Sequence, residues 1–130
     1  MARSIDDLLA EVRSGMVRLR PCEAAVRAAA GALLVDTRFA AQRREHGAVP
    51  GAVAIERNHL EWRLDPASPD RIPQAVDHDV EVILICQEGY STSLAAATLQ
   101  ALGLHRATDV IGGVDGWRDA GLALLPAPDA

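Results

Sequence analysis

The stretch DVEVILICQEGYSTSLAAATLQALG, residues Asp79–Gly103, decides the fold of this chain. It begins with a continuous run of aliphatic residues, passes through a short polar loop, and ends in an alanine- and leucine-rich segment closed by glycine. A short apolar run of this kind predicts a strand buried on both faces, over Val80–Cys86, and the segment after the loop predicts a helix over Ser91–Leu102. The sequence therefore places Cys86 at the carboxyl end of a buried strand, directly before a loop and a helix.

The segments on either side continue this alternation of strands and helices. Glycines, prolines and one Ser cap mark the ends of the expected elements. Strands that alternate with helices predict a doubly wound α/β fold, a parallel β-sheet flanked by helices in a single domain. We expect an N-terminal helical extension over 1–16, the domain over 17–125 and a flexible tail over 126–130. The further helices are expected at 4–14, 21–30, 58–64 and 114–120. The further strands are expected at 32–36, 52–55 and 107–111, and a surface loop at 65–73.

Composition excludes several classes of protein. The 130 residues carry a net charge of −5 without a basic stripe, which argues against a nucleic-acid partner. The start of the chain lacks the uniform apolar core of a signal peptide, and no apolar stretch is long enough to span a membrane. Two widely separated cysteines, Cys22 and Cys86, suit a reducing cytoplasm, and they form no ligand set with the four dispersed histidines. We therefore expect a cytoplasmic protein with no metal, no cofactor and no membrane partner.

The loop after Cys86 has the features that activate a thiol. Gly89 allows a tight curl that can direct the backbone N–H groups of residues 87–91 toward the sulfur, and the following helix adds the positive end of its dipole. Both effects favour a thiolate, which is the nucleophilic form of cysteine. A cysteine at the end of an apolar strand is also a common inert core residue, and the loop alone does not decide between the two interpretations.

Four segments in order resemble the rhodanese family. CQEGYS is similar to its active-site loop, whose usual form is C-x-x-G-x-R followed by a small hydroxyl residue. LLVDTR (Leu33–Arg38) resembles a strand with a D-x-R ending, HGAVPGAVAI (His46–Ile55) resembles G-H-I-P-G-A-x-N-I, and DVIGGVDGWRDAGLAL (Asp109–Leu124) resembles the closing L-x-G-G-x-x-x-W segment. The resemblance implies a rhodanese-like, single-domain sulfurtransferase.

Within that family, Cys86 would carry sulfane sulfur as a persulfide and pass it to a nucleophilic acceptor. The expected partners are a small sulfane-sulfur donor or a protein persulfide, and a thiol acceptor. Asp36 is expected to support the loops of the site structurally. The candidate substrate-binding residues are Gln87, Glu88, Gly89, Tyr90, Ser91, Thr92 and Arg38.

The loop departs from the family pattern at one position. Ser91 stands where the usual arginine would clamp an anionic donor, and a serine hydroxyl cannot replace the charge and bidentate geometry of a guanidinium. Glu88 adds a negative charge to the same loop. Both changes disfavour thiosulfate, with Arg38, Arg57, Arg63 or Arg118 as candidates to supply charge from outside the loop.

Two other functions remain open. A rhodanese-like binding or regulatory module with weak or no turnover would also account for the missing arginine. A cysteine phosphatase or arsenate reductase needs a Cys-x5-Arg loop, and Thr92 stands at that arginine position. This second alternative is therefore the weaker of the two.

Overall fold

The structure is a computed structural model, and it describes residues 1–127. Its centre is a parallel sheet in which four strands lie in the order β2-β1-β3-β4. These are β1 (Leu33–Asp36), β2 (Val53–Ala54), β3 (Val82–Ile85) and β4 (Ala107–Asp109). The central pair β1 and β3 is in register from Leu33 opposite Val82 to Asp36 opposite Ile85, so both strands end at the same edge. The predicted parallel α/β fold is confirmed.

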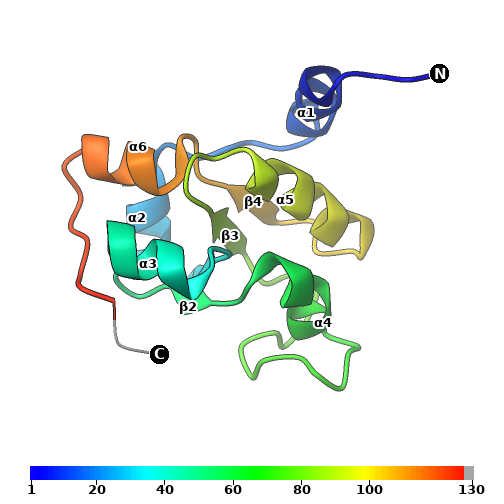
Figure 1. Cartoon of the computed structure of the whole chain (residues 1–130). Helices are drawn as coiled ribbons and strands as arrows, with labels where there is room; N and C mark the ends of the chain where they lie inside the picture. The colour runs from blue at the N-terminus through cyan, green and yellow to red at the C-terminus, as the bar shows by residue number, and fades with distance from the viewer. Residues whose placement is uncertain (128–130) are drawn as a thin grey trace.

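Helices cover both faces of this sheet (Figure 1). One face packs Leu34, Ile83 and Ile85 against apolar residues of α2 (Pro21–Ala29) and α6 (Gly113–Asp119). The other face packs Val35, Val82 and Leu84 against α4 (Leu60–Leu64) and α5 (Ser91–Ala101). Because neighbouring residues of β3 point to opposite faces and both faces are covered, the whole strand is buried and apolar, as its sequence predicts.

The N-terminal helix α1 (Ile5–Ser14) lies outside these layers and packs on α5. Ser4 caps it, since the Ser4 hydroxyl accepts a hydrogen bond from the Asp7 amide at 3.0 Å, and Gly15 follows its last turn as predicted. Leu9 is the residue of α1 that is buried in this contact. The chain then returns to the sheet, where Leu19 forms a parallel bridge with Val110.

Two stretches differ from the sequence prediction. The helix α3 (Ala40–His46) was not predicted, because it buries none of its residues and follows Phe39 rather than a polar cap, so neither an apolar period nor a capping signal marks it. The helix expected over 58–64 is a 3₁₀ turn, η1 (Arg57–His59), continued by α4.

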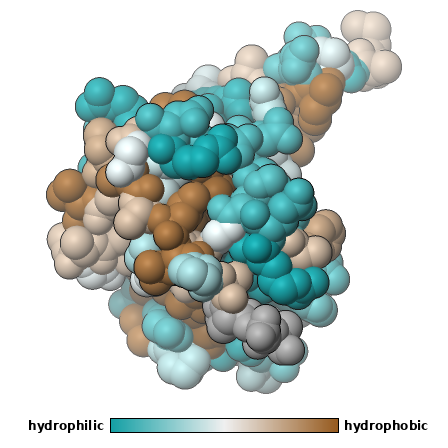
Figure 2. Space-filling view, turned by 60° about the vertical axis from the view of Figure 1, so that its left-hand side comes forward, coloured by the Kyte–Doolittle hydropathy of each residue, from teal (hydrophilic) through white to brown (hydrophobic). Residues whose placement is uncertain are grey.

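The C-terminal segment runs back over the molecule after α6. Leu125 forms an antiparallel bridge with Ala48, and the Trp117 indole N–H donates to the Ala123 carbonyl at 3.0 Å. Of the tail predicted over 126–130, residues 128–130 lie outside the described part of the chain. The surface of this side of the molecule is mixed, with apolar areas between hydrophilic ones (Figure 2).

Candidate active site

Cys86 follows directly after β3 and begins the loop that leads into α5. The strand was predicted to include Cys86, but its ladder ends one residue earlier, because the Cys86 carbonyl accepts a hydrogen bond from the Val114 amide of α6 at 2.8 Å. The next carbonyl, of Gln87, accepts from the Asp115 amide at 3.0 Å. The first turn of α6 thus fixes the start of the loop.

The sulfur of Cys86 is held by two groups of its own loop. The Gly89 amide donates to Sγ at 3.2 Å, and the Thr92 hydroxyl oxygen lies 3.3 Å from Sγ. Burial raises the pKa of Cys86, but hydrogen bonds from Thr92, Ser91 and Gly89 outweigh it, so the pKa lies below that of an ordinary cysteine. The start of α5 directs its dipole at the same place. The sulfur therefore sits in an environment that favours the thiolate.

A pocket of about 370 Å³ opens at this cysteine. Two larger hollows, of about 530 and 650 Å³, flank Glu81 and its ion pairs with Arg27 and Arg106, and Cys86 lines neither. Because the nucleophile decides where covalent chemistry occurs, the smaller pocket is the candidate active site. It is lined by Thr37, Arg38, Phe39, Gln42, Arg57, Cys86, Gln87, Glu88, Tyr90 and Ser91.

The predicted loop residues divide between the pocket and its back wall. Gln87, Glu88, Tyr90 and Ser91 line the pocket, and the last three are exposed. Gly89 and Thr92 are buried and lie on the sulfur rather than among the lining residues. A donor would thus meet the first group directly and the second only through Cys86.

Asp36 and Arg38 form a buried ion pair beside the pocket. Arg38 donates through Nε and Nη2 to the Asp36 carboxylate, at 2.8 to 3.2 Å, and through Nη2 to the Gly47 carbonyl at 2.8 Å. Its Nη1 donates to Gln87 Oε1 at 3.0 Å. Since all three guanidinium nitrogens donate hydrogen bonds, Arg38 joins the end of β1 to the chain at Gly47 and Gln87 and has little capacity left to bind a substrate.

Of the other candidate arginines, the structure brings Arg57 to the pocket. Its Nη1 contacts the Glu61 carboxylate at 2.7 and 2.9 Å, and its side chain is about two-fifths exposed. Arg63 bonds to the Asp70 carbonyl and Arg118 pairs with acidic residues of α6, and neither lines the pocket. Arg57 and Arg38 are the cations among the described lining residues.

Sequence reasoning missed a polar network behind the loop. Asp109, the last residue of β4, is fully buried and accepts a hydrogen bond from the Ser93 hydroxyl at 2.8 Å. The Thr92 hydroxyl oxygen lies 2.9 Å from the same carboxylate and 3.3 Å from Cys86 Sγ, and its single proton is donated to one of the two at a time. Arg18 donates to the same carboxylate at 2.8 and 3.2 Å. Asp109 could have been noticed, because it is a carboxylate inside a stretch predicted as a buried strand, over 107–111, whereas nothing in the sequence points to Arg18.

The remaining polar candidates stay apart from the site. Cys22 is exposed near the start of α2 and does not line the pocket. No histidine occurs among the described lining residues, and residues 1–127 contain no group of His, Cys, Asp and Glu side chains that could hold a metal ion. Within the same part of the chain, no helix combines the length and the apolar character needed to cross a membrane.

The model of the rhodanese-like domain family matches residues 22–120. The chain belongs to this family. The matched segment contains the sheet, the Cys86 loop and α6, whereas α1 and Arg18 precede it.

Individual relatives carry different descriptions. The thiosulfate sulfurtransferase GlpE of Actinobacillus pleuropneumoniae is 36% identical over 66 residues, which are 51% of this chain and 61% of that protein. A protein of unknown function from Rhodopseudomonas palustris, described as a possible tyrosine phosphatase, has a TM-score of 0.85 at 31% identity, covering 95% of this chain and 96% of that one.

A third relative shows the fold alone. The polysulfide-sulfur transferase homodimer of Wolinella succinogenes has a TM-score of 0.70 at 24% identity, with 92% of this chain and 85% of that chain covered. At this identity the likeness is one of architecture.

Proposed function

We propose that this rhodanese-like protein is a sulfurtransferase that carries sulfane sulfur as a persulfide on Cys86. The environment of the Cys86 sulfur supports the proposal. The sulfur lies at a pocket and is contacted by the Gly89 amide and the Thr92 hydroxyl, and the pKa of the Cys86 thiol is lowered. A thiolate in this setting is a preformed nucleophile, so the first step needs no separate base.

Two displacements at sulfur complete the proposed cycle. The Cys86 thiolate attacks the sulfane sulfur of the donor, an S–S bond forms, and the donor's own bond to that sulfur breaks with release of the remainder as an anion. An acceptor thiolate then attacks the outer sulfur of the Cys86 persulfide, which restores the Cys86 thiolate and leaves a persulfide on the acceptor. Neither step consumes an external oxidant or reductant.

The pocket favours donors with less negative charge than thiosulfate. Ser91 provides no cation, Glu88 contributes a negative charge, and the positive charge of Arg57 is balanced by Glu61. Phe39 and Tyr90, both largely exposed, give the mouth of the pocket an apolar rim. A small organic persulfide, a polysulfide or a protein persulfide suits this environment better than a compact dianion.

The other two functions receive less support from the site. A phosphatase would need strong positive charge around the phosphate, and the loop offers hydroxyls at positions 91 and 92. A binding module without turnover would not need a cysteine whose pKa is lowered, although it remains compatible with the family. The cytoplasmic location stays a prediction.

Intact-protein mass spectrometry tests the proposal. After incubation with polysulfide or cysteine persulfide and removal of excess donor, we expect the wild type and Cys22→Ser to gain one sulfur atom and Cys86→Ser to gain none. Addition of a thiol should remove the sulfur from Cys86. If no donor, thiosulfate included, leaves a sulfur on Cys86, the sulfurtransferase function is excluded and the binding module becomes the better interpretation.

A further inference from the structure

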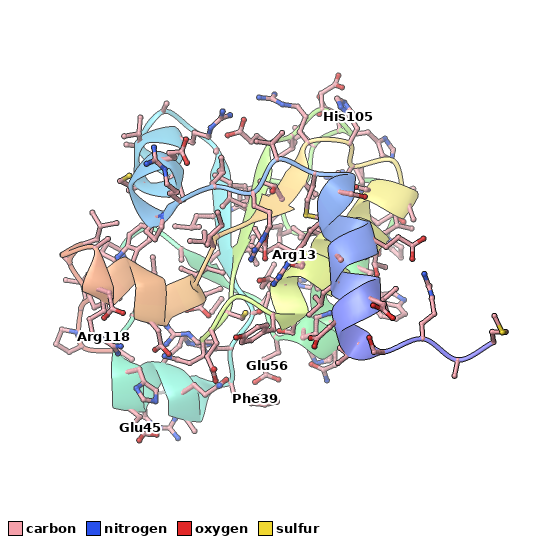
Figure 3. All side chains as sticks on the ribbon, turned by 90° about the horizontal axis from the view of Figure 1, so that it is seen from above. Arg13, Phe39, Glu45, Glu56, His105 and Arg118 are labelled. Atoms are coloured by element: carbon pink, nitrogen blue, oxygen red, sulfur yellow. The ribbon has the colours of Figure 1, made fainter. Side chains whose placement is uncertain are left out.

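Two arginines from outside the family segment converge on one carbonyl of the active-site loop. Arg13 Nη2 and Arg18 Nη2 each donate a hydrogen bond to the Gly89 carbonyl oxygen at 2.9 Å. Arg13 lies in the last turn of α1 and reaches toward the start of α5 (Figure 3), and Arg18 lies in the segment that joins α1 to α2. Both precede residue 22, where the family match begins.

Each guanidinium is also held by a second contact. Arg13 Nε donates to the Ser93 hydroxyl at 3.0 Å, and its guanidinium carbon lies 6.0 Å from the centre of the Tyr90 ring. Arg18 forms its ion pair with the fully buried Asp109, and its own side chain is only 16% exposed. The two arginines are therefore fixed in place on the side of the loop away from the pocket.

The clamped carbonyl determines where the loop's N–H groups point. In a trans peptide the carbonyl of Gly89 and the N–H of Tyr90 point in opposite directions, so a carbonyl held at the back directs that N–H forward. Gly89 also has a φ of 87°, and its own N–H donates to Cys86 Sγ. The arginines thus fix the peptide group between Gly89 and Tyr90. The peptide group between Glu88 and Gly89 is fixed by its N–H, which donates to the sulfur.

We propose that Arg13 and Arg18 are positioning residues that replace, from behind the loop, part of what an arginine at position 91 would provide. They hold the loop in the conformation that cradles sulfur, and they place two guanidinium groups next to a peptide of the cradle. The charge of Arg18 is balanced by Asp109, whereas Arg13 forms no ion pair among the described residues, so the net positive charge comes from Arg13. A charge behind the loop stabilises a thiolate or persulfide without occupying the pocket, whereas an arginine within the loop would also bind an anionic donor directly. The N-terminal extension is in this view part of the active site.

Charged groups other than the two arginines also face Cys86 and influence its titration. On the pocket side these are Arg38, Arg57 and Glu88, and behind the loop Asp109 acts through Thr92. Asp36 and Asp115 act through Arg38 and Gln87. None of these groups bonds to Arg13, so replacement of Arg13 alters one charge only.

Arg13→Ala and Arg13→Gln, both in a Cys22→Ser background, test the proposal through Cys86 alone. Loss of Arg13 leaves the Gly89 carbonyl bonded to Arg18 and leaves the Ser93 hydroxyl bonded to Asp109, so both variants should fold. We expect alkylation of Cys86 by iodoacetamide near pH 7 to slow about tenfold, as for the loss of one charge-assisted hydrogen bond, and its pH profile to move to higher pH. Arg13→Lys should recover part of the rate.

The matched control is Arg3→Ala, which removes an arginine from the same N-terminal region where it pairs with Glu11 on the surface. It should leave alkylation unchanged. The proposed role of Arg13 in holding the loop, called here the clamp, would be overturned by either of two results. One is a folded Arg13→Ala whose alkylation of Cys86 has the pH profile of the wild type. The other is an Arg3→Ala that slows alkylation as much as Arg13→Ala does.

Sulfur transfer is measured in parallel and rests on the proposed function, whereas alkylation does not. Absence of transfer in the wild type with a shifted alkylation profile in Arg13→Ala would reject the sulfurtransferase and keep the clamp. Normal transfer in the wild type with no shift would reject the clamp alone.

Discussion

At the scale of single residues, the site depends on how little charge surrounds a reactive sulfur. Cys86 is 8% exposed, and the groups that lower its pKa are two backbone amides and two hydroxyls rather than a cation in contact with it. Ser91 lines the pocket and is exposed, so its side chain points to where a donor would lie. The residue that distinguishes this loop from the family pattern is therefore placed to control donor charge, and its hydroxyl also helps to lower the pKa of Cys86.

Ser91→Arg should restore binding of an anionic donor. A guanidinium at this exposed position can reach the pocket and offer two parallel hydrogen bonds to the oxygens of thiosulfate, and we expect kcat/KM for thiosulfate to rise at least about tenfold. Ser91→Gln, which adds length and hydrogen-bonding capacity without charge, is the control and should change kcat/KM little. Steady-state kinetics with thiosulfate make the comparison. A fall or no change in Ser91→Arg would mean that thiosulfate is bound elsewhere.

At the scale of elements, the sequence predicts what is buried and regular and misses what is held by distant side chains. The central strands and α5 were predicted within about two residues, since continuous apolar runs and terminal glycines mark them directly. The exposed helix α3 carries no such mark. Within the site, Cys86 and Gly89 follow from the loop pattern, whereas the contact of Arg13 with Gly89 joins residues 76 apart and leaves no trace in local sequence.

The Gly112–Gly113 turn shows the same distinction. The sequence indicates a turn there, and both residues have positive φ, but Gly113 also packs on the start of the active-site loop. A Cβ at Gly113 would lie 2.4 Å from the Cys86 carbonyl oxygen and 2.8 Å from the Gln87 carbonyl carbon. The absence of a side chain at Gly113 is what allows α6 to donate its first amides to the loop.

Gly113→Ala should therefore damage the site as well as the fold. Gly121→Ala is a matched control, because Gly121 also has positive φ and its Cβ would meet nothing within 4 Å. Both variants lose about 1 kcal/mol of stability through backbone strain, and Gly113→Ala should lose about 2 kcal/mol more because of the overlap. Urea denaturation measures the free energy of unfolding, and the rate of alkylation by iodoacetamide measures the reactivity of Cys86. Equal losses in the two variants, with normal alkylation of Cys86, would contradict the close contact.

At the scale of the whole molecule, the segment before the family domain is joined to the core by an ion pair with a buried carboxylate. Arg18 reaches from the chain after α1 to the buried Asp109 at the end of β4, and Asp109 in turn orders Thr92 and Ser93 at the start of α5. All buried side-chain nitrogens and oxygens in residues 1–127 have hydrogen-bond partners, and this network accounts for several of them. The same contacts that fold the N-terminal segment onto the domain thus also hold the active-site loop.

Removal of Arg18 should consequently cost more than removal of any surface arginine. In Arg18→Met the Asp109 carboxylate stays buried with only two hydroxyl donors, and we expect the free energy of unfolding to fall by about 3 kcal/mol. Arg20→Met, two residues along the chain, breaks an exposed pair with Glu23 and should change stability little.

The double variant Arg18→Met/Asp109→Asn separates the buried charge of Asp109 from the hydrogen bonds that the Arg18 guanidinium donates. It leaves a neutral oxygen to accept from Thr92 and Ser93, so it should recover more than half of the stability that Arg18→Met loses in urea denaturation. If the double variant is no more stable than Arg18→Met, the hydrogen bonds that the Arg18 guanidinium donates, rather than its neutralisation of the Asp109 charge, fix the N-terminal segment. In that case Cys86 alkylation should be equally slow in both variants, because the segment has then left the loop in each.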